Sequence, residues 1–387
     1  MAVNLSENAR NYVLELIRRA ISAGEVKLPT EREIAAVHPA SYGTIRLVTQ
    51  QLEKEGFICK IRGSGTYIRP EAADLLRQNS WRKVWFFHAP FTAVQEPVNA
   101  DINFGYHVLE EIRKSAEKRN WNLQTCIVHS HDQFLTELQR NFSPGDAILY
   151  LPPTEHFSPR QLGRLARYSA VPFVVIDAEF GDISISHVTT DNRFGGMLAA
   201  RHLLENGFRH LTVLLSEPKL RQQNSRVQGF KEMAQLAGAS VEIIDCCVAG
   251  IDNRIEKVYE TIEPLAKEGK LPKAVFVTSD AGAFGFYEAL KKYDFIIGKD
   301  VVLVGFDGVP YGKKLSPPLA TVVQPIHEIC DKAFEILENW VVGEHPQFQL
   351  YPALRPGESC TAFETVCHPR NNSSTASFNM VYWSPEK

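Results

Sequence analysis

The sequence predicts an α/β protein with two parts: a small helical module that ends in a two-stranded hairpin, and a larger two-lobed body built on parallel sheets. Within residues 1–70, three stretches have apolar side chains at helical spacing, and two short β-prone runs around a Gly-Ser-Gly turn follow them. From Lys83 onward, short apolar runs alternate with amphipathic stretches, the pattern of strands covered by helices. These runs are too numerous for one sheet of ordinary size, so we expect two lobes with a cleft between them.

The composition is that of an ordinary folded protein. The chain has 387 residues, of which 44% are apolar and 22% charged, enough for two or three domains. No apolar run is long enough to span a bilayer, and the first residues have no secretory signal pattern, so we expect a cytoplasmic location. The seven cysteines form no CxxC pair, and no histidine stands at metal-ligand spacing. The sequence therefore predicts neither a metal nor a cofactor.

The N-terminal module, which we call the head, has clear helix boundaries. The first helix is predicted for residues 5–20 from its apolar spacing. Thr30 and Glu33 have the spacing of a capping box, which begins the second helix. Ser41 can cap the third helix, which stops near Gly56. The order of these elements predicts a helix-turn-helix.

The third helix has two different faces. Ile45, Val48 and Leu52 fall on one face, which we expect to be buried. Gly43 and Arg46 fall on the opposite face, where a small residue permits close approach and an arginine can pair with a phosphate or a guanine edge. This exposed face suits the major groove of DNA.

Two β-prone runs after Gly56 predict a hairpin, and such a hairpin beside a helix-turn-helix is a wing. Lys60 and Arg62 place positive charge at its base, and Gly63 lets backbone amides approach phosphates. Residues 1–70 carry a net charge of +3 and the remainder −6, which fits a nucleic-acid contact at one end of the chain. The alternative is a protein-interaction module in which Arg46 and Arg62 are solvated surface charges.

The head resembles the GntR-type winged helix-turn-helix. The motifs LPTERE, S-x-x-T-x-R, L-x-x-E-G-F and R-G-S-G-T-Y occur in order within residues 5–70. Three departures, at Pro39, Tyr42 and Gly43, imply that the DNA sequence it reads is partly its own. The resemblance and the exposed faces together predict DNA contacts at Arg32, Ser41, Tyr42, Gly43, Thr44, Arg46, Arg62 and Gly63.

The rest of the chain divides into three further segments. We predict a linker at 71–82, as a short helix or a plain tether, because composition changes there. The body follows at 83–365. Residues 366–387 are polar and lack core-forming runs, so we predict a disordered tail.

Several polar side chains follow strands of the body directly. In parallel sheets, ligands bind beyond the carboxyl ends of strands. The strand-end residues include His88, Phe91, Asp177, Ser279, Asp280 and Asp307. Carboxylates that converge on one cleft suit a small polyhydroxylated ligand, with Phe91 or Phe104 as a stacking face. As alternatives, Asp280 caps the helix that follows it, and Phe91 is ordinary core or lining.

The body resembles the effector domain of the LacI/GalR regulators, which is like a periplasmic sugar-binding protein. The segments VTTDNRFGGMLAARHLLENGFRHLTVL, NSRVQGFKEMAQLAG and AVFVTSDAGAFGFYEALKK carry this resemblance, with VVLVGFDGVP and SPPLATVVQP further on. It implies that Asp191 and Asn192 open the second lobe, and that the chain crosses between lobes near Thr321–Pro325, with Gln324 near the hinge. It also implies effector contacts at Asp177, Arg226, Ser279 and Asp307.

The sequence therefore predicts a transcriptional regulator, most simply a repressor, that binds operator DNA as a homodimer. Its effector is expected to be a sugar bound between the lobes. The family's own DNA-binding headpiece and hinge helix are absent, and the combination with a GntR-type head resembles arabinose-type repressors. Asp177 and Asp307 are the one pair suggestive of a glycosidase, but no catalytic motif accompanies them, so we expect no enzyme. The alternative is a sugar-binding sensor whose head contacts a protein.

Overall fold

The computed structural model describes residues 5–73, 75, 83–90, 101–141, 146–165, 171–180, 183–250, 252–341 and 343–361. Most of the predicted linker at 71–82, the predicted tail at 366–387 and Phe91 lie outside these residues. Within the described ranges, no helix combines the length and the apolar character needed to cross a membrane.

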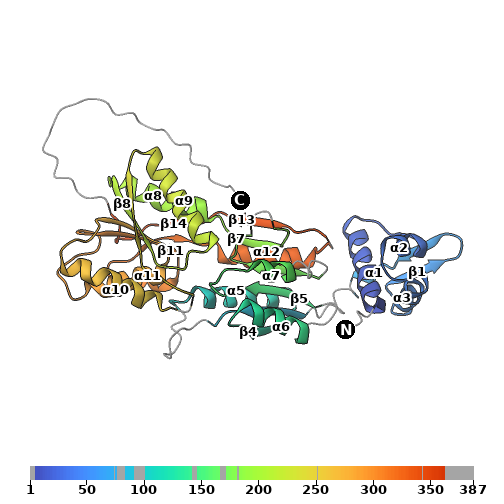
Figure 1. Cartoon of the computed structure of the whole chain (residues 1–387). Helices are drawn as coiled ribbons and strands as arrows, with labels where there is room; N and C mark the ends of the chain where they lie inside the picture. The colour runs from blue at the N-terminus through green and yellow to red at the C-terminus, as the bar shows by residue number, and fades with distance from the viewer. Residues whose placement is uncertain are drawn as a thin grey trace, which may run out of the picture.

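The head, blue in Figure 1, has the predicted three helices followed by an antiparallel hairpin. One apolar core joins these elements, since Val13, Leu52 and Ile58 come from different elements and are all buried in it. The prediction of a helix-turn-helix followed by a hairpin is thus confirmed. The elements are α1 (Leu5–Ser22), α2 (Glu31–Val37), α3 (Tyr42–Lys54), β1 (Ile58–Ile61) and β2 (Gly65–Ile68).

The predicted caps define the ends of the head's helices. The amide of Thr30 donates to Glu33 Oε2 at 2.7 Å, and the amide of Glu33 donates back to Thr30 Oγ1 at 3.3 Å. The amide of Thr44 donates to Ser41 Oγ at 3.2 Å at the start of α3. Gly56 has a φ of +89°, a left-handed conformation that ends α3 at low cost for glycine. Side-chain caps and the glycine after α3 therefore determine where these helices begin and end.

The body contains two sheets of six strands each, which confirms the two-lobed α/β prediction. All neighbouring strands are parallel except the pair at one edge of the second sheet. The first-lobe sheet, in spatial order, is β13 (Gln347–Leu350), β7 (His187–Thr190), β6 (Phe173–Ile176), β5 (Ala147–Leu151), β3 (Lys83–His88) and β4 (Asn122–Ile127). The second-lobe sheet is β14 (Ala353–Arg355), β12 (Ala320–Val323), β11 (Val302–Asp307), β10 (Ala274–Val277), β8 (His210–Leu215) and β9 (Ser240–Asp245).

Helices cover both faces of each sheet (Figure 1). In the first lobe they are α5 (Phe104–Lys118), α6 (His131–Asn141), α7 (Pro159–Leu165) and α12 (Ile326–Glu338). In the second lobe they are α8 (Asn192–Glu205), α9 (Arg221–Leu236), α10 (Arg254–Lys267), α11 (Asp280–Leu290) and the short 3₁₀ helix η2 (Pro310–Lys314).

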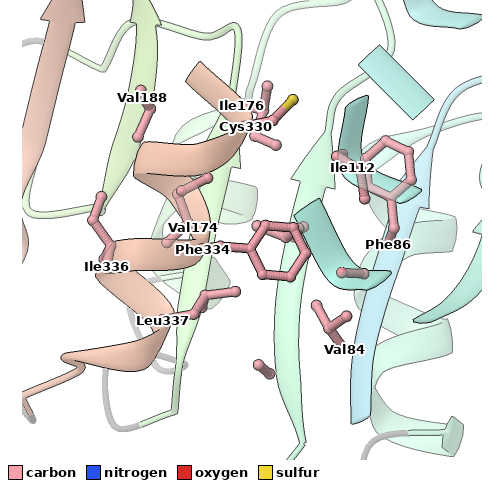
Figure 2. Packing of buried hydrophobic residues seen from close by; sticks show 14 of the residues in the cluster. Val84, Phe86, Ile112, Val174, Ile176, Val188, Cys330, Phe334, Ile336 and Leu337 are labelled. Carbon is pink, nitrogen blue, oxygen red and sulfur yellow. The ribbon is translucent and has the colours of Figure 1, made fainter. Parts of the chain in front are cut away.

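The late helix α12 completes the core of the first lobe. Figure 2 shows Phe334 and Leu337 of α12 together with Val84 and Phe86 of β3 and Ile112 of α5. All five side chains are at most 1% exposed. The first lobe is therefore incomplete without chain that follows the second lobe, which ties the two lobes together in folding.

The chain passes between lobes where the resemblance implied. It leaves β7 at Thr190, and Asp191 then caps α8 of the second lobe by accepting from the amide of Phe194 at 2.8 Å. It returns after β12 through Gln324 and Pro325 into α12, and crosses again between β13 and β14. These segments form the hinge region. The three segments meet at the ends of the strands, where they bring together residues that are far apart in the sequence.

Some elements differ from the predictions. Helix α9 begins at Arg221 with a polar first turn and no side-chain cap, so its start carries no capping signal in the sequence. Strand β13 carries largely exposed side chains and β14 partly buried ones, and neither QFQL nor ALR is an apolar run in the sequence. Both are edge strands that depend on pairing with β7 and β12.

Candidate functional site

A polar cluster lies at the strand ends beside the hinge. Asp177 follows β6 of the first lobe, whereas Asp307 ends β11 of the second. Arg226 of α9 approaches them, with its Nη1 3.7 Å from Asp307 Oδ1. Asp177 and Asp307 both have positive φ values, +56° and +122°, which non-glycine residues adopt rarely and mostly at functional positions.

Arg226 is held in one orientation. Its side chain is only 3% exposed. Its Nε donates to Asn192 Oδ1 at 2.8 Å, and its Nη1 donates to the carbonyl of Thr278 at 2.7 Å. The guanidinium lies 3.6 Å from the centroid of the Phe306 ring, a cation–π contact. The cluster thus has a fixed, buried cation.

Gln324 links the cluster to both lobes. Its Nε2 donates to Asp307 Oδ1 at 2.8 Å, and its Oε1 accepts from Thr190 Oγ1 at 2.6 Å. Asn192 continues the network by donating to the carbonyl of Thr190 and to Glu179 Oε1, both at 2.9 Å. A change at Asp307 therefore reaches the hinge through direct hydrogen bonds.

Sequence reasoning missed Glu179 and Thr190. Glu179 comes two residues after Asp177, beyond the same strand end, and its Oε2 accepts from Ser225 Oγ at 2.8 Å. This position beyond the end of a strand could have identified Glu179 from the sequence. Thr190 gave none, because its bond to Gln324 joins residues 134 positions apart.

The side chain of Asp280 forms hydrogen bonds within the protein. It is fully buried, with Oδ2 accepting from the amides of Gly308 and Val309 at 2.8 and 3.0 Å, and Oδ1 accepting from Thr321 Oγ1 at 2.6 Å. A side chain at Gly305 would place its Cβ 2.2 Å from Asp280 Oδ1. This carboxylate holds the loop after β11, and the geometry argues against the predicted effector contact.

The alternative that Asp280 caps α11 is wrong, because the neighbouring Ser279 is the N-cap of that helix. Ser279 Oγ accepts from the amide of Gly282 at 3.1 Å and lies 3.0 Å from Ser216 Oγ. Ser279 is 2% exposed, so the predicted effector contact there would need local rearrangement.

The two cleft carboxylates have unusual protonation behaviour. Burial raises the pKa of Asp177 to about 7; Arg226 opposes this effect, and the nearby carboxylates of Asp307, Glu179 and Glu217 add to it. Burial also raises the pKa of Asp307, again against the effect of Arg226. Asp177 Oδ1 is enclosed and has no hydrogen-bond partner among the described residues. Carboxyl groups with pKa values shifted in this way cluster at functional sites.

A second set of contacts joins the lobes away from the hinge. Thr154 Oγ1 donates to the carbonyl of Gly250 at 2.9 Å and accepts from Arg254 Nη2 at 3.0 Å. Arg254 Nε donates to Glu217 Oε2 at 3.0 Å. A Cβ at Gly250 would lie 2.9 Å from the carbonyl oxygen of Thr154, so glycine permits this close approach. We call these contacts the latch.

A cavity of about 630 Å³ opens beside the latch. The first lobe contributes Thr154, Glu155 and His156, and the second lobe contributes residues 218–220, 245 and 247–250. None of the predicted effector residues lines it. Among the described residues, no group of three or more His, Cys, Asp or Glu side chains is arranged to hold a metal ion.

The predicted DNA-contacting residues of the head lie at or near its surface. Arg32, Arg46 and Arg62 are exposed, and none forms an ion pair within the described part of the chain. Gly63 has a φ of +76° in the hairpin turn. At the start of α3, Ser41, Tyr42 and Gly43 are exposed and Thr44 is half-buried.

Lys60 differs from the prediction. Its Nζ lies 2.6 Å from Glu31 Oε1 and 2.9 Å from Thr49 Oγ1. The positive charge predicted at the base of the hairpin is therefore neutralised by α2. Its role is to fix the hairpin against the helices, which leaves Arg62 as the hairpin's exposed cation.

Comparison with known proteins shows which proteins the body is similar to. Residues 200–360 match the periplasmic binding protein-like domain family. The HTH-type transcriptional repressor PurR of Serratia proteamaculans (strain 568) is 26% identical over 250 residues, which cover 63% of this chain and 71% of that protein. The ribose operon repressor of Escherichia coli (strain K12) is 23% identical over 259 residues, 65% of this chain and 76% of that protein.

Solved structures agree on the fold. A LacI family transcriptional regulator from Enterococcus faecium, solved with bound ribose, superposes with a TM-score of 0.60 at 21% identity, over 73% of this chain and 100% of that one. A regulatory protein of the LacI family from Chloroflexus aggregans gives a TM-score of 0.59 at 24% identity, over 72% of this chain and 98% of that one. The body of this chain therefore has the two-lobed fold of these LacI-family regulators, and residues 200–360 are similar to the periplasmic binding protein-like domain.

Proposed function

We propose that this protein is a transcriptional repressor whose affinity for operator DNA is controlled by a small polyhydroxylated effector, a sugar or a close derivative. The observation that carries the proposal is the network of Arg226, Asp307, Gln324 and Thr190, which joins both lobes at the strand ends. The named relatives are repressors, one of them a ribose operon repressor, and none of those named is an enzyme. A cytoplasmic protein without catalytic activity fits this role.

In this proposal the head is a winged helix-turn-helix of the GntR type. It occupies residues 1–70 and is joined through a linker at 71–82 to the body at 83–365. The antiparallel hairpin after α3 supports this assignment. The contacting surface comprises Arg32, Ser41, Tyr42, Gly43, Thr44, Arg46, Arg62 and Gly63. Two such heads in a homodimer would read a palindromic operator.

The effector would bind between Asp177 of the first lobe and Arg226 and Asp307 of the second, with Phe91 as a candidate lining residue outside the described ranges. Contacts to both lobes favour one interlobe arrangement over another. A ligand can shift this equilibrium only as far as its affinities for the two arrangements differ. The latch and the hinge network are the contacts that such a shift would strengthen or break.

A gel-shift titration of the full chain with DNA from its own promoter tests the proposal. We expect sequence-specific binding that weakens with salt, because released counterions drive protein–DNA association. A sugar that raises the melting temperature of the protein should also change its affinity for the operator. Absence of specific DNA binding, with or without sugars, would contradict the proposal and favour a sensor whose head contacts a protein.

A further inference from the structure

Leu47 is an apolar side chain on the solvent-facing side of α3. Its exposed fraction is 67%, whereas Ile45 and Leu52 of the same helix are fully buried. Leu47 follows Gly43 by four residues, so the two lie one turn apart on the same face, and Arg46 lies beside them. The helix therefore presents a leucine, a glycine and an arginine together to solvent.

The inner and outer sides of α3 differ in how their polar side chains are bonded. On the inner side, Thr49 Oγ1 donates to Glu31 Oε1 at 2.6 Å, and Lys60 Nζ donates to the same oxygen at 2.6 Å. On the outer side, Arg46 and Gln50 are exposed, and neither side chain has a hydrogen bond or an ion pair among the described residues. The outer side thus offers a cation, an amide and an apolar side chain to a partner.

An apolar side chain among hydrogen-bonding ones suits one feature of DNA. In the major groove, thymine presents a 5-methyl group beside the oxygen and nitrogen atoms that bond polar side chains. The exposed Arg32, Arg46 and Arg62 supply positive charge for the phosphates around it. Apart from its own helix and its chain neighbours, a Cβ added at Gly43 would meet only Ser41 Oγ, at 3.7 Å. The outer side is therefore open enough for base edges to reach a leucine one turn later.

We propose that Leu47 determines part of the operator sequence by packing against the 5-methyl group of a thymine in each half-site. This inference rests on the proposed function and adds a base that the head reads. The contact is apolar, and it lies beside the hydrogen-bonding contact of Arg46. Because Leu47 has no charge, it contributes to the choice of sequence and not to the attraction between the head and phosphates.

Gel-shift titrations with altered operators test the inference. The probe is the promoter fragment that the full chain binds, with the thymines of one half-site replaced one at a time by deoxyuridine. This replacement deletes the methyl group and keeps every hydrogen-bonding atom of the base. At the thymine that contacts Leu47, we expect affinity to fall by roughly three- to fivefold, the effect of exposing one buried methyl group.

Leu47→Ala makes the test specific to this side chain. The variant should bind the unaltered operator more weakly by a similar factor or more, and the deoxyuridine at that position should no longer matter, because the partner of the methyl group is gone. Alanine is at least as favourable as leucine at an exposed helix position, so the variant should fold, and thermal unfolding checks this.

Leu236→Ala is the matched control. Leu236 is a leucine of the body at the end of α9 and is 79% exposed, so the same chemical change is made on an exposed helix residue outside the head. We expect this variant to keep the full operator affinity and the full sensitivity to deoxyuridine.

The inference and the proposed function can fail separately. If the full chain binds its operator specifically but no deoxyuridine weakens binding, or Leu47→Ala stays as sensitive to deoxyuridine as the unaltered protein, thymine reading by Leu47 is wrong and the repressor proposal stands. Equal weakening of Leu47→Ala on the operator and on unrelated DNA has the same meaning. If the full chain binds no DNA sequence specifically, the proposed function is wrong and this inference falls with it.

Discussion

The arginines at the predicted DNA-contacting surface of the head are exposed, whereas the arginine of the polar cluster in the body is buried. In the head, Arg32, Arg46 and Arg62 are exposed and form no ion pair within the described ranges. In the body, Arg226 is buried and fixed by Asn192, Thr278 and Asp307. Exposed cations without partners can exchange water for phosphate, whereas a buried cation acts through a few oriented contacts. This difference fits the proposed division, with DNA contact in the head and ligand binding in the body.

The two parts also differ in how their folds are determined. The head depends on contacts close in sequence, such as the Thr30–Glu33 capping box and the turn at Gly56. The body depends on contacts between distant segments, such as Thr190 with Gln324 and α12 with the first-lobe strands. Substitutions should therefore affect stability far more in the body's packed interfaces than at the head's surface.

The largest effect is expected where α8 and α9 pack closely. A Cβ at Gly229 would lie 1.8 Å from the carbonyl oxygen of Arg193. Gly229→Ala must separate the two helices, and we expect it to destabilise the body by about 4 kcal/mol or more. Calorimetry would measure the loss.

Gly163→Ala is the matched control for that variant. Gly163 lies in helix α7, and a Cβ there meets no atom within 4 Å. We expect Gly163→Ala to be neutral or to stabilise by up to about 1 kcal/mol, since alanine favours helices. Equal melting temperatures for the two variants would contradict the helix-packing argument.

Loss of Arg226 should have the next largest effect. Arg226→Ala leaves Asp307 buried without its cation, which we expect to cost about 3–5 kcal/mol of body stability. It should also abolish the rise in melting temperature caused by the effector. Arg221→Ala, an exposed arginine on the same helix, should preserve that rise. A normal ligand response in Arg226→Ala would mean that the site is misplaced.

The stability of the body should depend on pH through the buried carboxyl group of Asp177. The folded pKa of Asp177 is about 7, above the ordinary value of 3.8, so the folded state binds the proton more tightly. Its contribution to stability is present at low pH and is lost as pH rises toward 7, approaching about 1.4 kcal/mol per pH unit at most. Between pH 5 and 7, thermal unfolding of the body should show this loss, to which the raised pKa values of Asp307 and Asp280 also contribute, and Asp177→Asn should reduce its slope. An unchanged slope in the variant would contradict the assignment.

The latch should give the smallest effect. Thr154→Ala removes the bonds to Gly250 and Arg254, which we expect to contribute about 1 kcal/mol, or roughly a fivefold faster effector dissociation. Thr136→Ala makes the same change on α6, where its hydroxyl bonds only within the helix. Stopped-flow release of a bound sugar would measure the difference, and equal rates in both variants would show that the latch does not hold the cleft.

The sequence was most informative where structure is local. Capping residues, the Gly-Ser-Gly turn and the alternation of apolar runs were enough to predict the head and the two lobes, whereas the crossing near Thr321–Pro325 was implied by the family resemblance. Strand-end positions also predicted the place of Asp177 and Asp307. Edge strands β13 and β14 were not predicted, because their sequences QFQL and ALR contain no run of apolar residues.

The partners of the site residues could not be predicted from the sequence. Asp280 looked like a cleft residue, yet it bonds Thr321 and the loop after β11, 27 to 41 positions away. Lys60 was predicted to place positive charge at the base of the hairpin, yet it pairs with Glu31. In both cases the residue type was informative, but only the fold determines which neighbour occupies its hydrogen bonds.

The most direct test of the central claim compares one head variant and one body variant in two assays, operator binding and effector binding. We predict that Arg46→Ala weakens operator binding by about 1–3 kcal/mol and leaves effector affinity unchanged. Arg226→Lys should retain operator binding and lose the effector response. Arg19→Ala, an exposed arginine of the head that is near Glu15, is the control for operator binding. If Arg46→Ala leaves operator affinity intact, or Arg226→Lys responds normally to effector, the division between a DNA-reading head and a ligand-sensing body is contradicted.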